Sequence, residues 1–75
     1  MNSFLIETRM HPDGRAVPVM VLRTLTPFRS GGWRQSYSFF VDGYCAGERV
    51  CREAAAREAA FLVETGAMDL LGLSP

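Results

Sequence analysis

Alternating apolar and polar residues near the start of the chain predict a β-hairpin. Within residues 3–11, Ile6 and Met10 fall on one face of a strand, with charged residues between them. The Pro-Asp-Gly sequence at 12–14 favours a tight turn, because proline presets the backbone angle and glycine accepts a left-handed conformation. The largely apolar residues 16–25 form the predicted return strand.

This return strand is apolar on both faces. Pairing across the turn, with His11 opposite Arg15, places three of its side chains on the same face as Ile6 and Met10: Ala16, Met20 and Leu22. The opposite face carries Leu5 and three valines: Val17, Val19 and Val21. Pro18 has no N–H to donate, so we expect it to face a sheet edge or a bulge.

A second hairpin is predicted after a loop at 26–34. Residues 35–41 alternate as a third strand, and the Asp42-Gly43 pair is typical of a two-residue type I′ turn. Residues 44–50 are either a fourth strand or an irregular approach to a helix, because Gly47 weakens a strand.

Residues 52–65 predict an amphipathic helix. Alanine, glutamate and arginine are good helix formers, and Gly66 is a natural stop. The apolar half of this helix is expected to contain Ala54, Ala55, Ala59, Phe61 and Leu62. The predicted fold class is therefore α+β. Residues 1–75 form a single domain, in which an antiparallel sheet of three to four strands, built from two hairpins, carries one C-terminal α-helix on one face.

One helix of this length shelters one face of the sheet and leaves the other uncovered. We expect the uncovered face to carry five apolar side chains: Leu5, Val17, Val19, Val21 and Phe40. Such a patch is larger than monomers normally expose, and it favours self-association as a homodimer or contact with a partner protein. The alternative is that the loop at 26–34 and the end of the chain fold under the sheet and cover it.

Arginines and aromatic residues are interleaved between the second and third strands. The residues concerned are Arg23, Phe28, Arg29, Trp33 and Arg34. Trp and Arg are enriched in protein-binding hot spots, so we predict these as partner-binding residues. Two alternatives are open: stacking against single-stranded nucleic acid, or Trp33 folding back to cap the core.

Glu58 falls near the centre of the helix's apolar half, where an ionised carboxylate requires a partner. It is predicted as a buried carboxylate in a structural ion pair with a sheet arginine such as Arg23 or Arg49. If the helix is rolled, Glu58 lies at the rim instead. The functional alternative is a general base, or an acid that binds a partner.

No residue pattern in the chain indicates catalysis. His11 is the single histidine, and local spacing places no carboxylate beside it, so we expect a solvated loop residue. The Gly31-Gly32 pair lacks the Lys-Ser/Thr of a phosphate loop. We therefore predict a non-enzymatic protein with no metal and no cofactor.

The net charge is zero, but the charges are unevenly distributed. Residues 1–40 carry a net +3 and residues 41–75 a net −3. A neutral total makes nucleic acid less favoured than protein as a partner. Cys45 and Cys51 lie in no metal or redox motif and indicate free thiols in a reducing cytoplasm. Since no apolar stretch is long enough to span a membrane and no signal peptide is evident, we expect a cytoplasmic protein without membrane contact.

The chain has partial resemblances to known groups. Its alanine-rich helix, with the strand before it, resembles the end of double-stranded RNA-binding domains, although Arg52-Glu53 stands where that family has lysines facing phosphate. Its strand–strand–strand–helix order is similar to the arm-binding domain of phage integrases. In size and in lacking a catalytic set it resembles small phage-encoded inhibitors, including anti-CRISPR proteins. The favoured function is a protein-binding module that inhibits a partner, as an accessory protein of a phage or mobile element in the host cytoplasm. The alternative is a nucleic-acid-binding βββα domain.

Overall fold

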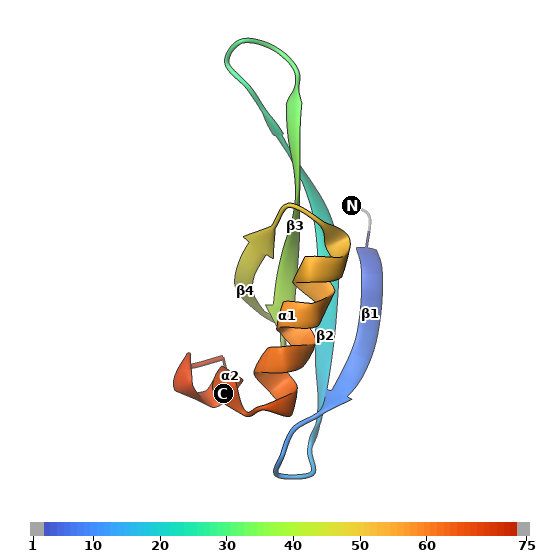
Figure 1. Ribbon diagram of the computed structural model, residues 1–75, viewed down its shortest axis with the longest axis vertical. Coiled ribbons are helices and arrows are strands. Elements are labelled where there is room, and N and C mark those ends of the chain that lie inside the picture. Colours follow the sequence, from blue (N-terminus) through green and yellow to red (C-terminus); the bar gives the residue numbers. More distant parts are fainter. Residues whose placement is uncertain (1–2, 74–75) are drawn as a thin grey trace.

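Four strands follow one another across one antiparallel sheet, and a helix crosses one of its faces (Figure 1). The computed structural model describes residues 3–73. The strands are β1 (Ser3–Met10), β2 (Ala16–Pro27), β3 (Trp33–Val41) and β4 (Tyr44–Arg49), and the helices are α1 (Arg52–Glu64) and the one-turn α2 (Ala67–Leu70). The predicted α+β class, with α1 packed on one face of an antiparallel sheet, is confirmed.

Both predicted hairpins form with the expected turns. The N–H of His11 donates to the carbonyl of Arg15 over 2.8 Å and closes the β1–β2 turn. Asp42 and Gly43 both have positive φ, 53° and 85°, as a type I′ turn requires. Tyr44–Arg49 form a fourth strand, so the alternative of an irregular approach to the helix does not hold.

A bulge fits β4 beside β3. Gly47 lies opposite Phe39 whereas Cys45 lies opposite Phe40, so Ala46 is an additional residue in β4. Gly47 has a φ of 150°, and a Cβ atom built there would lie 3.1 Å from the ring of Phe39. Glycine is needed at this position because the Phe39 ring lies directly against the β4 backbone.

The core lies between α1 and the sheet. Helix α1 buries four residues at helical spacing: Ala55, Ala59, Leu62 and Val63. The sheet contributes Val17, Val19, Val21, Phe39 and Val41, and α2 contributes Met68. The two alanines let the helix approach the sheet closely, and full burial of each valine stabilises the fold by roughly 1.5 kcal/mol or more.

The predicted assignment of sheet faces is wrong for four of the five residues proposed for self-association. Val17, Val19 and Val21 lie beneath α1 with exposures of 1% or less, and Leu5 packs against the same core. Phe40 is on the uncovered face, as expected, where it lines a hollow together with residues of β1 and β2.

The error comes from the register between β2 and β3. The β1–β2 pairing is as predicted, but Val21 lies opposite Phe39 and Met20 lies opposite Phe40. The valines therefore share a face with Phe39 and Val41, and α1 covers this more apolar side. A register shift of one residue between the two strands would have exchanged the faces.

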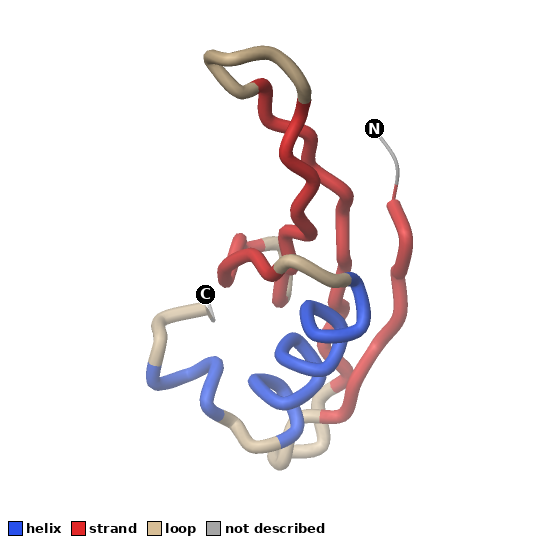
Figure 2. The backbone as a smooth tube through the Cα atoms, turned by 45° about the horizontal axis from the view of Figure 1, so that its top comes forward, coloured by secondary structure: helices blue, strands red, loops and turns tan. Residues whose placement is uncertain are grey.

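The face opposite α1, here called the open face, stays uncovered. Ile6 is 72% exposed and Met10 is 59% exposed there. Met68 anchors α2 in the core under α1, and the tip between β2 and β3 points away from the sheet (Figure 2). Within residues 3–73, neither segment folds under the sheet as the alternative supposed.

Helix α1 is rolled relative to its predicted apolar half. Phe61, expected to face inward, is 55% exposed, and Val63 is buried instead. Three consecutive apolar residues, Phe61 to Val63, cannot all face the sheet, because successive helical residues are 100° apart. Leu62 and Val63 take the buried positions.

Strands β2 and β3 continue beyond the rest of the sheet as a two-stranded arm, residues 24–36 (Figures 1 and 2). Pairing with β1 extends only to Leu22 of β2, and pairing with β4 only to Tyr37 of β3. The arm accounts for the elongated shape, which measures 47 × 21 × 18 Å. The loop predicted at 26–34 is shorter, because residues at both of its ends extend the strands.

Candidate binding surfaces

The arm presents large side chains that have no core beneath them. Trp33 is 65% exposed and Phe28 is 50% exposed. Leu25 and Trp33 lie on the same side of the ribbon as the residues that α1 covers in the body of the sheet. Leu25 pairs with Gln35, and Trp33 pairs with Pro27. Trp33 therefore does not cap the core, and that alternative is wrong.

The tip of the arm is a closed turn. The N–H of Gly31 donates to the carbonyl of Phe28 over 3.1 Å, and the N–H of Phe28 donates to the carbonyl of Gly32 over 3.0 Å. Gly31 and Gly32 have φ values of 95° and 85°, which glycine adopts without strain. These contacts fix Arg29 and Ser30 as the central residues of the turn.

The arm is basic. Residues 24–36 contain two arginines, Arg29 and Arg34, and no acidic residue, and Arg23 lies directly before them. Nη2 of Arg34 lies 3.7 Å from Oε1 of Glu48 in β4, and both side chains are about half exposed. Arg29 makes no ion pair with any residue in 3–73. Exposed ion pairs contribute little, so Arg29 and Arg34 can both meet an acidic group from outside.

Four of the five predicted partner-binding residues lie together on the arm: Phe28, Arg29, Trp33 and Arg34. The fifth, Arg23, lies at the base of the arm, opposite Tyr37. The structure brings these four residues together on a projecting two-stranded ribbon, whereas the sequence predicted a loop.

The open face of the sheet is a second surface. One row across it consists of Ile6, Met20, Phe40 and Cys45, one residue from each strand. Ile6, Met20 and Phe40 line a hollow of about 200 Å³, with Pro18, Val19 and Gly43 around it. This apolar hollow, without charged lining residues, is suited to an apolar side chain.

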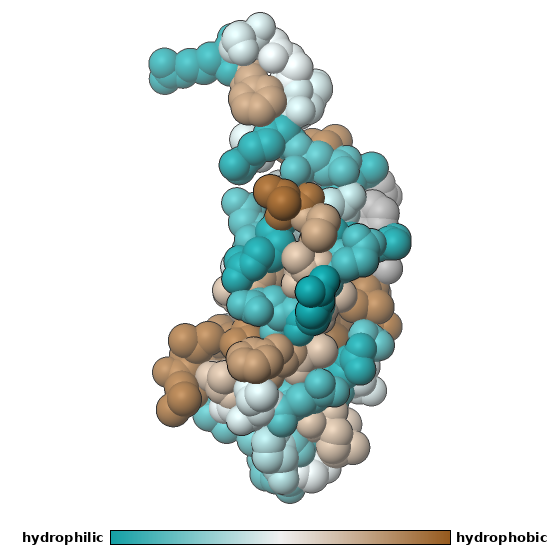
Figure 3. All heavy atoms as spheres, viewed as in Figure 1, coloured by the Kyte–Doolittle hydropathy of each residue, from teal (hydrophilic) through white to brown (hydrophobic). Residues whose placement is uncertain are grey.

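The surface on the α1 side of the molecule is divided into a hydrophilic and a hydrophobic part. Hydrophilic residues dominate the surface over α1, whereas hydrophobic residues gather over α2 (Figure 3). The exposed residues of this cluster include Leu70 and Leu71.

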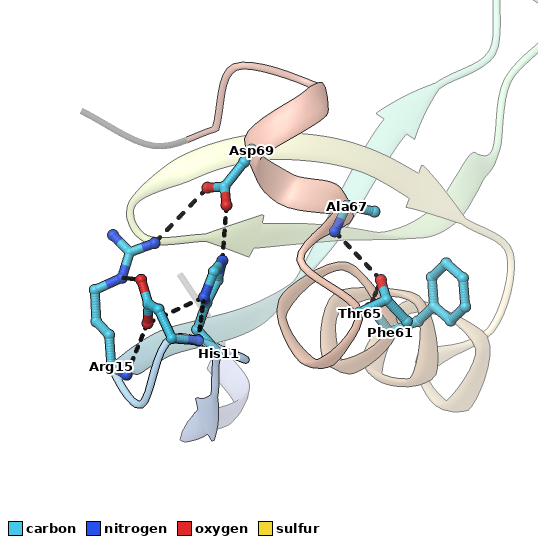
Figure 4. A network of polar contacts seen from close by, with 7 residues as sticks. His11, Arg15, Phe61, Thr65, Ala67 and Asp69 are labelled. Carbon is cyan, nitrogen blue, oxygen red and sulfur yellow. Dashed lines mark hydrogen bonds and ion pairs between the residues drawn. The ribbon is translucent and has the colours of Figure 1, made fainter.

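A polar cluster joins α2 to the β1–β2 turn (Figure 4). The buried His11 donates from Nε2 to Oδ2 of Asp69 over 2.8 Å, and its Nδ1 accepts from the N–H of Asp13 over 3.1 Å. Arg15 lies 3.7 Å from Oδ1 of Asp69. The expectation of a solvated histidine with no carboxylate beside it is wrong. His11 is buried, Oδ1 of the neighbouring Asp13 lies 3.0 Å from its Nδ1, and the carboxylate of Asp69 comes from the far end of the chain.

The contacts of this polar cluster attach α2 to the β1–β2 hairpin. Both ring nitrogens of His11 already have hydrogen-bond partners, so neither is available to bind a ligand. The pKa of Asp13 is held below its ordinary value, first because the N–H of Arg15 donates to its Oδ1 over 2.9 Å and then because of attraction to His11 and Arg15. The contacts tie α2 to the hairpin at the opposite end of the molecule from the arm (Figure 1).

Glu58 is not a buried carboxylate. Its side chain is 39% exposed, at the rim of α1, and its Oε1 accepts from Arg49 over 2.9 Å. The predicted ion pair therefore forms with Arg49, one of the two arginines named, but burial was wrong because of the roll of α1. Arg49 also lies 5.1 Å from the centre of the Phe39 ring, so this pair covers an edge of the core.

A hollow of about 260 Å³ lies between β4 and α1, lined by Arg49, Ala54, Arg57, Glu58 and Phe61. In the part of the chain that the structure describes, no group of three or more His, Cys, Asp or Glu side chains could hold a metal ion. Cys45 and Cys51 are exposed free thiols. Neither described helix combines the length and apolar character needed to cross a bilayer.

Comparison with known proteins finds no family that matches this chain, no similar curated protein and no similar solved structure. Function is therefore inferred from the surfaces themselves.

Proposed function

We propose that the protein is a non-enzymatic protein-binding module whose arm binds an acidic partner protein. The observation that best supports this is the exposure of Trp33 and Phe28 on an arm that has no core of its own. Trp and Arg are enriched among the residues that dominate binding energy in protein interfaces. The arm carries both types, Trp33 together with Arg29 and Arg34.

The construction of the arm suits binding. Its strands are paired from Thr24–Ser36 to Pro27–Trp33, and hydrogen bonds close its tip. Side chains held in this way lose less conformational freedom on binding than those of a flexible loop.

The charge of the arm points to an acidic partner surface. The arm together with Arg23 at its base carries a net +3, and because the whole chain is neutral, the remainder carries a net −3. Arginine binds carboxylates through two parallel hydrogen bonds. An acidic partner is attracted to the arm and repelled by the rest of the molecule, which orients the encounter.

A small module that occupies a functional surface of a larger protein blocks that surface. We therefore include inhibition of the partner in the proposal, in keeping with an accessory protein of a phage or mobile element.

Nucleic acid is the second candidate for the arm. Exposed aromatics such as Phe28 and Trp33 can stack on bases, while arginines neutralise phosphates. Protein remains favoured because three arginines provide few phosphate contacts, and the net −3 of the remaining chain repels a polyanion.

Photo-crosslinking from the tip tests the proposal. A photoreactive residue replacing Ser30, which is exposed between Arg29 and Gly31, should crosslink to the partner in an extract of the cells that express the chain. The identified partner, once purified, is titrated with wild type and with the double variant Arg29→Ala/Trp33→Ala. We expect affinity to fall at least tenfold, since each hot-spot residue contributes about 1–2 kcal/mol or more.

Arg57→Ala is the matched control, because Arg57 is an exposed arginine on α1 that makes no ion pair within residues 3–73. It should bind as wild type does. Equal affinity of the double variant and wild type contradicts binding through the arm. Crosslinks to nucleic acid alone, with an affinity that falls steeply as salt is added, establish the second candidate instead.

A further inference from the structure

Strand β1 lies at an edge of the sheet and presents backbone groups that its neighbour does not use. The N–H of His11 donates to Arg15 across the turn, and in an antiparallel ladder successive residues point alternately toward and away from the paired strand. The backbone groups of Ile6, Thr8 and Met10 therefore point away from β2. An edge of this kind is a template for another strand.

The opposite edge, β4, is less suited to pairing. It is six residues long and carries the bulge at Ala46, which interrupts its regular ladder. By contrast, the register of β1 against β2 shifts only at its start, between Ser3 and Leu5, and the six residues from Leu5 to Met10 pair regularly and include no proline. Bulges, prolines and charged side chains are the devices that protect edges. From Leu5 to Met10, β1 has neither a bulge nor a proline, and its two charged residues, Glu7 and Arg9, have opposite signs that a second copy can match.

The residues of β1 form a pattern that is symmetric about Thr8. Apolar residues, Ile6 and Met10, lie two positions away on either side, and opposite charges, Glu7 and Arg9, lie between. We propose that two copies of this chain pair through β1, antiparallel, with Thr8 opposite Thr8 of the partner subunit. A two-fold axis perpendicular to the sheet relates the copies, and their sheets join into one.

The charges are complementary in this register. Glu7 lies opposite Arg9 of the partner subunit, at a non-hydrogen-bonded position where side chains approach most closely. Within one copy, Arg9 already contacts Oε1 of Glu7 at 2.8 Å and Oε2 of Glu64 at 3.7 Å. Its Nε, however, is buried without a hydrogen-bond partner in the described chain. Pairing brings a second glutamate to each Arg9.

The apolar residues match as well. Ile6 lies opposite the partner's Met10, so the two exposed side chains of each copy shelter one another on the open face. The row formed by Ile6, Met20 and Phe40 then continues into the second subunit. Thr8 and the two Ile6–Met10 pairs contribute about six backbone hydrogen bonds, since each hydrogen-bonded pair exchanges two.

Other symmetric registers lack this complementarity. Centring the axis on Glu7 places two carboxylates face to face, and centring it on Arg9 does the same with two guanidinium groups. Centring it on Ile6 or Met10 leaves Glu7 without an arginine opposite. The register about Thr8 is the one that gives both charges an opposite partner.

The two-fold symmetry determines how the two arms of the dimer are directed. Because the axis is perpendicular to the sheet, both α1 helices lie on the same side and the arms point in opposite directions. The dimer is therefore bivalent toward whatever the arms bind.

Sedimentation equilibrium over a concentration series tests this pairing. We expect the wild-type mass to approach twice the 8.3 kDa of one copy. Thr8→Pro should remain at the mass of one copy, because proline removes an N–H on the outer edge while leaving the bonds to β2 intact. Circular dichroism and thermal unfolding check that this variant is folded.

Exchanging the charges of Glu7 and Arg9 distinguishes loss of the proposed contact from a general loss of stability. Glu7→Arg places two cations opposite each other across the axis, and we expect at least a tenfold weaker dimer. The double variant Glu7→Arg/Arg9→Glu restores opposite charges and should return the dimer affinity to within a few fold of wild type. A loss caused by misfolding would not be rescued in this way.

Disulfide formation reports the register directly. In a chain carrying Cys45→Ser and Cys51→Ser, Thr8→Cys should form a covalent dimer on oxidation, since the Cα atoms of a hydrogen-bonded pair are about 5.5 Å apart. Ile6→Cys is the matched control, because its two copies are about 14 Å apart along the strands and cannot bridge.

A wild-type chain that stays monomeric at about 1 mM overturns the proposal. So does a dimer that tolerates Thr8→Pro, or equal crosslinking by Thr8→Cys and Ile6→Cys. These outcomes are independent of the arm, since Arg29→Ala/Trp33→Ala leaves β1 unchanged and should sediment as wild type does.

Discussion

Nε2 of His11 lies 2.8 Å from Oδ2 of Asp69, although 58 residues separate the two along the chain. His11 closes the β1–β2 turn, and Asp69 belongs to α2, directly after the buried Met68. Gly66 turns the chain between the helices with a φ of 78°, and a Cβ atom there would lie 3.8 Å from Nε2 of His11. The hydrogen bond therefore fixes where α2 docks.

Removing the carboxylate of Asp69 should loosen this attachment. We expect Asp69→Ala to lower the free energy of unfolding by about 1–3 kcal/mol, because the buried donor of His11 loses its acceptor. Asp69→Asn retains an acceptor oxygen and should cost less. Urea unfolding at neutral pH measures both, with the exposed Glu53→Ala as a control expected to stay within about 0.5 kcal/mol of wild type. If Asp69→Ala is as stable as that control, the contact does not stabilise the fold.

Asp13 makes the stability of the same turn depend on pH. Its pKa is lowered on folding from the ordinary value of 3.8, chiefly by the hydrogen bond from the N–H of Arg15. An acid whose pKa falls on folding stabilises the folded state above its ordinary pKa, and this contribution is lost as the pH falls through the lowered value. We therefore expect Asp13→Asn to be less stable than wild type at neutral pH, with a difference that shrinks below pH 3.8. Urea unfolding of both proteins across that range measures it, and a difference independent of pH contradicts the expectation.

Local features of the fold could be predicted because neighbouring residues determine them. The Asp42-Gly43 turn needs two positive φ angles, and few residue pairs provide them. Gly66 ends α1 for a similar reason, since its φ of 78° is incompatible with helix continuation. The exposed arm residues Phe28 and Trp33 were identified because proline and glycine mark that segment as irregular.

Contacts between distant segments could not be predicted in the same way. The face covered by α1 depends on the register of β2 against β3, and the turn at Phe28–Gly32 that sets this register has no two-residue signature. Asp69, which accepts from His11, lies at the other end of the chain, where no spacing rule reaches. The rotation of α1 about its axis depends on which sheet face it packs against, and this rotation leaves Glu58 partly exposed.

Val19 and Met20 provide a direct test of which face is covered, because they are adjacent and point to opposite sides. Val19 is fully buried beneath α1, whereas Met20 is half-buried on the open face. We expect Val19→Ala to lower the free energy of unfolding by about 2 kcal/mol, from lost burial and the cavity left behind. Met20→Ala should cost clearly less in a monomeric sample. Urea unfolding at low protein concentration measures both, and the reverse order would mean that α1 covers the other face.

Gly47 should tolerate no side chain, because its backbone angle and the ring of Phe39 both exclude one. Its φ is 150°, and an added Cβ atom would lie 3.1 Å from the ring, a distance that requires the ring or the strand to move. Gly14→Ala is the matched control, since Gly14 has a φ of 92° but nothing within 4 Å of its added Cβ atom.

Both alanine variants should lose stability from backbone strain, by about 1 kcal/mol or more. We expect Gly47→Ala to lose about 1–3 kcal/mol beyond Gly14→Ala, because the displaced ring disturbs a fully packed core. Urea unfolding gives the two losses. Since the Phe39 ring also lies beneath Arg49, a displaced ring should weaken the Arg49–Glu58 pair, and Glu58→Gln should then cost less in the Gly47→Ala background than in wild type. Equal losses of stability for Gly47→Ala and Gly14→Ala would mean that the packing of the Phe39 ring does not require a glycine at position 47 of β4.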